Sequence, residues 1–138
     1  MKLDLVSTGY LFFKDKVLLI FHSKLDKWLP VGGHIEKNES PTQSLTREVK
    51  EETNLDIEIL FDPKLPLISK NLLPTPIFVD IHSVGDHDHC SFYYLCKVLN
   101  PEALQINKEL KDAKWFSKQE IIELDLLEDV KMSETICF

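Results

Sequence analysis

Several features that define common protein classes are missing from this sequence of 138 residues. Its three cysteines, Cys90, Cys96 and Cys137, form no spaced framework, so we expect reduced thiols in a cytoplasmic protein and no disulfide scaffold. No apolar run approaches the roughly 20 residues that a transmembrane helix needs. The first residues, Met1–Asp4, do not resemble a signal peptide. These absences predict a cytoplasmic protein that does not cross a membrane.

Acidic residues outnumber basic ones, 23 to 16, and glycine is scarce. The formal net charge of −7 argues against binding to DNA or RNA, which requires a basic surface. A small phosphorylated substrate is still compatible with this charge, because a bound metal ion would neutralise the anions locally. The four glycines form no nucleophile elbow, Walker loop or dinucleotide-binding motif, and His-Glu-x-x-His is absent. The catalytic schemes that depend on these motifs are therefore not indicated.

The composition that remains is typical of one small globular domain. Hydrophobic residues make up 43% of the chain and charged residues 28%. A chain of this length can bury a core without disulfides or structural metals. We find no internal repeat and no low-complexity linker, so we expect a single domain over residues 1–138.

The most informative segment is a predicted helix at about residues 41–53. Ser40 is a favourable N-cap, Pro41 suits the first helical position, and Gln43 completes a capping box. Asn54 can end the helix because asparagine tolerates the left-handed conformation.

Three glutamates crowd one face of this helix. Glu48, Glu51 and Glu52 stand at i, i+3 and i+4, where like charges repel by a few tenths of a kcal/mol per pair. With about 100° per residue, Leu45 and Val49 lie directly beside them, so the carboxylates border the buried seam. Hard cations such as Mg²⁺ are held by a few carboxylates together with substrate phosphates. The spacing therefore predicts a metal-binding helix, although a solvated charged helix is the ordinary alternative.

Residues 33–55 resemble the Nudix box, Gly-x5-Glu-x7-Arg-Glu-U-x-Glu-Glu-x-Gly-U, in which U is aliphatic. The matching positions are Gly33, Glu39, Arg47, Glu48, Val49, Glu51, Glu52 and Leu55. Asn54 replaces the second glycine of the box, and asparagine is a common substitute for glycine at positive φ. Residues 28–33 and 115–117 also resemble the flanking segments of the family. The resemblance implies the Nudix fold, an α/β/α sandwich with a mixed β-sheet.

The resemblance also implies a reaction: metal-dependent hydrolysis, by water, of the diphosphate linkage in a nucleoside diphosphate joined to another group. Nucleoside triphosphates and nucleotide sugars are substrates of this kind, and Mg²⁺ or Mn²⁺ is the expected cofactor. Glu48 and Glu52 are the leading metal ligands, and Glu51 is a third ligand or helps to deprotonate water. Gly33 would offer its backbone to the metal or phosphate, and Arg47 would orient the glutamates or simply pair with Glu51.

Two other classes of function stay open. A non-catalytic Nudix-like module would bind a nucleotide without cutting it, although such modules usually lose a glutamate of the box, and none is missing here. An interaction domain would instead dock a basic partner on its acidic helix. The oligomeric state is also open, a homodimer included.

The rest of the chain predicts strands, loops and one further helix. Ser117 and Glu120 form a second capping box before the last helix, whose apolar face includes Leu127. Residues 28–39 are expected to be a loop, and 63–76 a substrate-facing irregular stretch that begins at Pro63. Strands are expected at residues 5–13, 17–22, 55–61, 77–84, 91–98 and 114–116.

The histidine-rich segment at residues 82–90 is the second feature of interest. His87 and His89 would share one strand face and Cys90 the other, so these three are poorly placed to bind one zinc ion. The alternatives are a polar turn between two strands or a role in binding substrate or as a base, for which His87, Asp88 and His89 are candidates. Glu109 is another candidate base.

Two aromatic residues and two thiols have competing interpretations. Trp28 and Tyr94 could stack on a nucleobase, but a place in the core is expected for each. Cys90 and Cys96 fall inside predicted strands, where a structural thiol is expected rather than a nucleophile.

Overall fold

The structure of the chain is a computed structural model that describes residues 2–61 and 73–128, with side chains to residue 124. Within these residues, eight strands form one mixed sheet in which β1 runs parallel to β7 and the other pairs are antiparallel. The elements, in chain order, are β1 (Leu3–Phe13), β2 (Lys16–His22), β3 (Lys27–Leu29), β4 (Val31–His34), α1 (Pro41–Thr53), β5 (Ile57–Leu60), β6 (Phe78–Ser83), β7 (Asp88–Val98), the short 3₁₀ helix η1 (Pro101–Ala103), β8 (Leu110–Phe116) and α2 (Lys118–Glu128).

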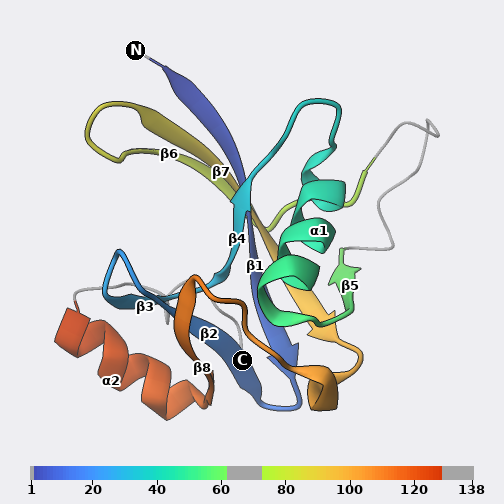
Figure 1. Cartoon of the computed structure of the whole chain (residues 1–138), viewed down its shortest axis with the longest axis vertical. Coiled ribbons are helices and arrows are strands. Elements are labelled where there is room, and N and C mark those ends of the chain that lie inside the picture. The colour runs from blue at the N-terminus through green and yellow to red at the C-terminus, as the bar shows by residue number, and fades with distance from the viewer. Residues whose placement is uncertain (1, 62–72, 129–138) are drawn as a thin grey trace.

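The two α-helices pack on separate hydrophobic clusters of the sheet (Figure 1). Successive side chains of a strand point to opposite faces, and β2 shows the consequence. Leu18 packs in the cluster that contains Leu45 of α1, whereas Val17 and Leu19 pack with Ile121 of α2. All five side chains are fully buried. The predicted α/β/α sandwich is confirmed.

Helix α1 begins and ends at the residues that the sequence predicts. Ser40 Oγ accepts a hydrogen bond from the backbone N–H of Gln43, and Gln43 Oε1 accepts one from the backbone N–H of Ser40. Pro41 occupies the first turn. Asn54 has φ of 63°, and its backbone N–H donates to Lys50 O, which closes the last turn. Both helix ends are therefore fixed by local chemistry.

The prediction of a loop at residues 28–39 is wrong over its first half, where β3 and β4 lie. Strand β4 pairs with β1, and a Cβ on Gly32 would collide with the backbone oxygen of Ser7. Glycine is thus required where the two backbones meet. Such a short strand offers no alternation of apolar and polar residues, which explains why the pattern missed it.

Two strands, β7 and β8, begin well before the residues that the sequence predicts. Strand β7 begins three residues earlier than expected and β8 four residues earlier, because both continue their pairing with β6 and β2. Strands β6 and β7 form a hairpin that projects away from the helices together with the start of β1 (Figure 1). Residues 62–72, which include Pro63, and Cys137 lie outside the described residues, as does the side chain of Leu127.

The second capping box is confirmed. Glu120 Oε1 accepts a hydrogen bond from the backbone N–H of Ser117, and Ser117 Oγ accepts one from the N–H of Glu120. Among the described residues, neither helix has the length and apolar character needed to span a bilayer.

The cap of α1 gives a first testable prediction. Replacing Ser40 by alanine leaves the N–H of Gln43 without its acceptor, so we expect the free energy of unfolding to fall by about 1 kcal/mol. Urea denaturation followed by circular dichroism measures this change. Thr46→Ala removes an exposed hydroxyl from the same helix and serves as the control, with no destabilisation expected. Equal stability of the Ser40→Ala variant and the wild type would contradict the prediction.

Candidate functional site

Arg47, on α1, binds three carboxylates at once. Its Nε and Nη2 donate to the two oxygens of Glu39, at 2.7 and 3.0 Å. Its Nη1 donates to Glu48 Oε1 at 3.0 Å and to Glu51 Oε2 at 3.1 Å. Its Nη2 also donates to the backbone oxygen of His34, at the end of β4. The predicted pairing with Glu51 is confirmed, but it is one part of a larger network.

This network perturbs the protonation of its members. The hydrogen bond to Glu39 raises the pKa of Arg47 above its usual range, and the same bond lowers the pKa of Glu39. Glu39 is therefore a direct partner of Arg47. It holds the guanidinium that in turn holds Glu48 and Glu51.

Two of the three helix glutamates turn toward the glycines of β4. A Cβ on Gly33 would lie 2.5 Å from Glu48 Cδ, so this carboxylate occupies the space that a larger residue would fill. The backbone N–H of Gly32 donates to Glu52 Oε1 at 3.3 Å. The side chain of Glu48 is 17% exposed and that of Glu51 is 57% exposed. Glu48 and Glu52 are thus sheltered, while Glu51 faces outward.

Both sheltered carboxylates resist ionisation. Burial raises the pKa of Glu52 to about 8, and the neighbouring charge of Glu48 adds to the shift. Burial also raises the pKa of Glu48, although its hydrogen bond to Arg47 works in the opposite direction. Removing these charges from water is costly unless a cation compensates. Sheltered carboxylate oxygens beside an open glycine backbone fit a hard divalent cation such as Mg²⁺ or Mn²⁺.

A cavity of about 470 Å³ opens beside Glu52. Gly32, Gly33 and Glu52 line one part of it, and the aromatic rings of Trp28 and Tyr93 line another. The size and the mixture of apolar rings with a few polar groups are typical of small-molecule sites. The cavity therefore brings an aromatic surface next to the acidic one.

The two aromatic residues named from the sequence have different places. Tyr94 is only 2% exposed and lies in the core cluster beneath α1, as expected. Trp28 packs edge-on against Phe21 and Phe116 but also borders the cavity. Trp28 is consequently the better placed of the two to meet a ligand.

The segment before β8 adds contacts that the sequence pattern did not reveal. The backbone N–H of Asn107 donates to Glu52 O at 3.1 Å, and its side-chain amide donates to Glu51 O at 3.4 Å. Glu109 lies close enough for its charge to contribute to the raised pKa of Glu52. Asn107 thus holds the end of α1 through backbone atoms, and no periodicity marks such a contact.

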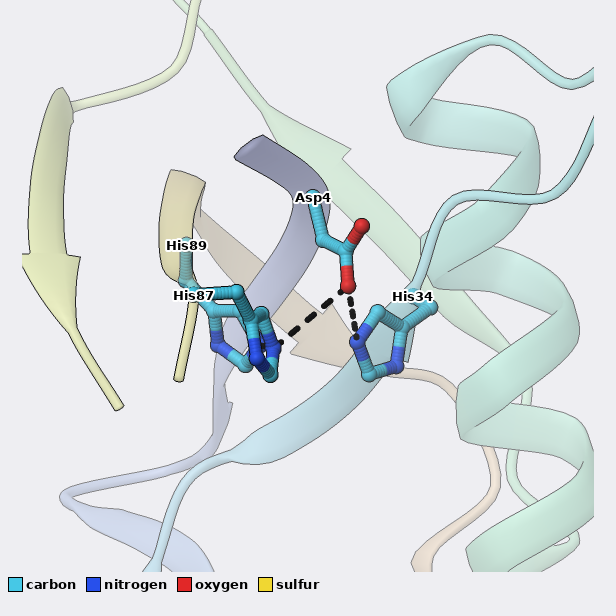
Figure 2. A group of neighbouring side chains, drawn as sticks. All are labelled: Asp4, His34, His87 and His89. Atoms are coloured by element: carbon cyan, nitrogen blue, oxygen red, sulfur yellow. Dashed lines mark hydrogen bonds and ion pairs between the residues drawn. The ribbon is translucent and has the colours of Figure 1, made fainter. Parts of the chain in front are cut away.

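The histidine-rich segment joins residues from two other strands. Asp4, His34, His87 and His89 each offer a ligand atom, and these four atoms lie within 4.8 Å of one another (Figure 2). His87 and His89 do approach each other, as their spacing predicts, with ring centroids 5.0 Å apart. Cys90 is not part of this group. The sequence could not foresee the group because Asp4 and His34 are distant along the chain.

The described thiols do not suggest nucleophilic catalysis. Cys96 is fully buried, and burial raises its pKa to about 12, so the thiolate is strongly disfavoured. Cys90 lies in β7 as a half-buried free thiol. The expected structural role is confirmed for Cys96.

The raised pKa of Glu52 predicts how stability depends on pH without added metal. Folded Glu52 keeps its proton up to about pH 8, whereas the unfolded chain loses it near 4.5. Because the folded state binds more protons in this window, the free energy of unfolding should fall as the pH rises from about 5 to 8. Denaturation curves at pH 5.5, 6.5 and 7.5 measure the slope. Glu52→Gln should have a shallower slope, and identical slopes for variant and wild type would contradict the assignment.

Comparison with known proteins gives a consistent result. The sequence matches the NUDIX domain over residues 5–136. It is 32% identical, over 102 residues, to a probable DHNTP pyrophosphohydrolase of Lactococcus lactis subsp. cremoris (strain MG1363). That match covers 73% of this chain but only 58% of the relative, so the chain spans little more than half of the length of that protein.

Solved structures show the same similarity. A crystal structure of a NUDIX-family hydrolase from Clostridium perfringens superposes with a TM-score of 0.78 at 31% identity, covering 93% of this chain and all of that one. The MutT protein from Methanosarcina mazei Go1 has a TM-score of 0.73 at 16% identity, covering 96% and 89% of the two chains, which shows the shared fold alone. By sequence and by fold, this chain belongs to the Nudix family.

Proposed function

We propose that this chain hydrolyses the diphosphate linkage of a nucleoside diphosphate derivative with the help of Mg²⁺ or Mn²⁺. The observation that carries the proposal is the sheltered pair Glu48 and Glu52, which faces the Gly32–Gly33 backbone beside a ligand-sized cavity. A structural helix has no need to place two carboxylates there. A helix that binds a cation and a phosphate group does.

Glu48 and Glu52 would hold the cation, with the backbone of Gly33 next to it and Glu51 as a third ligand. When bound, such a cation neutralises the phosphate oxygens and lowers the pKa of water that it coordinates. These chain residues supply what the cation needs: ionised oxygen donors in a sheltered place. The high pKa of Glu52 means that its proton must leave before a cation binds.

Arg47 would act as a positioning residue. Its guanidinium fixes Glu48 and Glu51 relative to each other and ties both to the end of β4 through His34 O. Glu51 is the most accessible of the helix glutamates, so it is also suited to accept a proton from the attacking water. Glu109 is a second candidate for this base, since its charge reaches Glu52.

The cavity indicates where the organic part of the substrate would lie. Trp28 lies at the cavity and could offer a ring surface for a flat base, and His89 offers a polar edge there. The ring of Tyr93 also borders the cavity, but it already stacks against Phe78 and Tyr10. His87 is not among the residues that line the cavity, and its Nε2 lies 3.1 Å from His89 Nε2, so it would act on substrate through His89. The named relative is a probable DHNTP pyrophosphohydrolase, so DHNTP belongs in a substrate panel with nucleoside triphosphates, ADP-ribose, dinucleoside polyphosphates and nucleotide sugars.

The two non-enzymatic alternatives have less support. A nucleotide-binding module without activity leaves unexplained why all four glutamates of the box are present and why three of them are held by Arg47. A protein-docking helix would expose its acidic side chains, whereas Glu48 is mostly covered. We therefore favour hydrolysis.

Replacing Glu52 by glutamine tests this directly. The amide has nearly the same shape but cannot carry the charge that binds a cation, and such cations stabilise a transition state by several kcal/mol. We expect kcat to fall by roughly 100-fold or more, since each 1.36 kcal/mol is about tenfold. Assays of the panel with Mg²⁺ and with Mn²⁺, scored for released phosphate or pyrophosphate, measure the effect. Glu58→Gln changes an exposed glutamate of β5 in the same way and should leave kcat unchanged. An unaffected rate in the Glu52→Gln variant would show that the cation is held elsewhere.

The effect of metal ions on stability distinguishes the hypothesis of an enzyme from that of an interaction domain that docks a basic partner. A cation that binds only the folded chain stabilises it by about 2.7 kcal/mol at 100 times its Kd. We expect Tm to rise with added Mg²⁺ or Mn²⁺ in the wild type and in Glu58→Gln, but much less in Glu52→Gln. Thermal shift measurements at constant ionic strength, with K⁺ as the control cation, make the comparison. A Tm that does not change with either divalent cation would support the interaction domain that docks a basic partner.

A further inference from the structure

We propose that Asp4, His34, His87 and His89 form a second metal site, separate from the carboxylates of α1 and suited to Zn²⁺ or a similar transition-metal ion. The four residues come from the start of β1, the end of β4 and the beginning of β7 with its preceding turn. Figure 2 shows their polar atoms converging on one point.

Three of the six distances between the ligand atoms are close to those of a four-coordinate site. Zinc binds imidazole nitrogen and carboxylate oxygen at about 2.0–2.2 Å, so the edges of a tetrahedral site measure about 3.3–3.6 Å. Asp4 Oδ2 lies 3.6 Å from His34 Nε2 and 3.5 Å from His87 Nε2. His87 Nε2 lies 3.1 Å from His89 Nε2. The other three pairs of ligand atoms also lie within 4.8 Å, so the side chains would have to close in by up to about 1 Å for one ion to contact all four groups.

A carboxylate behind the site gives independent support. Asp86 Oδ1 lies 2.7 Å from His87 Nδ1, on the side of the ring that faces away from the other ligands. Histidine ligands commonly donate this second N–H to a carboxylate, which fixes the tautomer and turns the unprotonated nitrogen toward the metal. Asp86 thus prepares Nε2 of His87 as a ligand.

The groups around Asp4 leave one of its oxygens to this site. Lys2 Nζ lies 3.6 Å from Asp4 Oδ1, whereas His34 and His87 both approach Oδ2. A hydrogen bond between His87 and His89 would explain that one contact, but it would not explain why a third imidazole and a carboxylate oxygen meet at the same point. A shared cation explains all of these approaches.

The type of donor distinguishes this site from the acidic one. Three imidazole nitrogens favour Zn²⁺, Co²⁺ or Ni²⁺, whereas Mg²⁺ favours oxygen donors such as Glu48 and Glu52. With four protein ligands, the coordination sphere is closed, as in structural zinc sites. A bound ion would tie the projecting hairpin of β6 and β7 to β4, where His34 follows Gly33. It would thereby stiffen the wall of the cavity that His34 and His89 line.

Zinc titration of the full chain tests the proposal. After treatment with a chelator, isothermal titration with ZnCl₂ should show one ion bound per chain by the wild type. Asp86 only hydrogen-bonds a ligand, so Asp86→Asn should weaken zinc affinity by about 10- to 100-fold. His87→Asn and His89→Asn each remove a ligand and should weaken it by more than about 100-fold. His22→Asn is the matched control, because His22 is a histidine outside the group. This variant should bind zinc with the affinity of the wild type.

A second measurement separates the two sites and keeps the test valid if one variant folds poorly. Co²⁺ in a tetrahedral site absorbs visible light, so the bound chain should be coloured in the wild type and in Glu52→Gln and colourless in His87→Asn. The far-ultraviolet circular dichroism of each variant without metal should match that of the wild type, and a variant that does not match is replaced by the other histidine variant.

Three results would overturn the proposal. One is the absence of stoichiometric zinc binding by the wild type. Another is zinc affinity that is unchanged in both His87→Asn and His89→Asn. Loss of zinc binding in Glu52→Gln would count in the same way, because it would place the zinc at the carboxylates of α1. The third is a Tm that rises with inorganic pyrophosphate but not with zinc. If this rise disappeared in His87→Asn, the histidines would be an anion site.

Discussion

The close approach of α1 to the backbone of β4 is the constraint on which the site depends. Glu48 fills the space where Gly33 would carry a Cβ, and the N–H of Gly32 reaches Glu52. Any larger residue at position 33 would displace the carboxylate, and at position 32 it would push β4 away from β1. Two neighbouring glycines therefore serve different partners, one on the helix and one in the sheet.

The helix that carries these carboxylates is held at both ends by groups that are not acidic. At its start, Ser7 Oγ donates to Pro41 O and Ser44 Oγ donates to His34 O, which anchors the first turns to β1 and β4. At its end, Asn107 binds the backbone of the last turn. Because these attachments use backbone oxygens, they leave the glutamate side chains to be oriented by Arg47 and by the N–H of Gly32. A rigid element whose functional groups are held in place by neighbouring groups is what a precise binding site requires.

The features of the fold and site that could be predicted from the sequence are those that depend on residues close together in the chain. The caps of α1 and the i, i+3, i+4 spacing of its glutamates involve residues close in the chain, so helix and carboxylate face could both be inferred. Strand β4 escaped prediction because glycine carries no hydrophobic pattern. Asn107 and the partners of His89 escaped it for a different reason. Their contacts join residues far apart in sequence, and only the sheet topology brings them together.

The charges around Arg47 favour the binding of a further cation at this site. Its single guanidinium is shared by Glu39, Glu48 and Glu51, and its Nη2 also binds a backbone oxygen. With Glu52 ionised as well, four carboxylates face one positive side chain, and a diphosphate would bring additional negative charge. At short range in a sheltered place, such repulsion amounts to several kcal/mol. Arg47 is already committed to the carboxylates, so under the proposed function the charge needed to admit a phosphate would arrive with a metal ion.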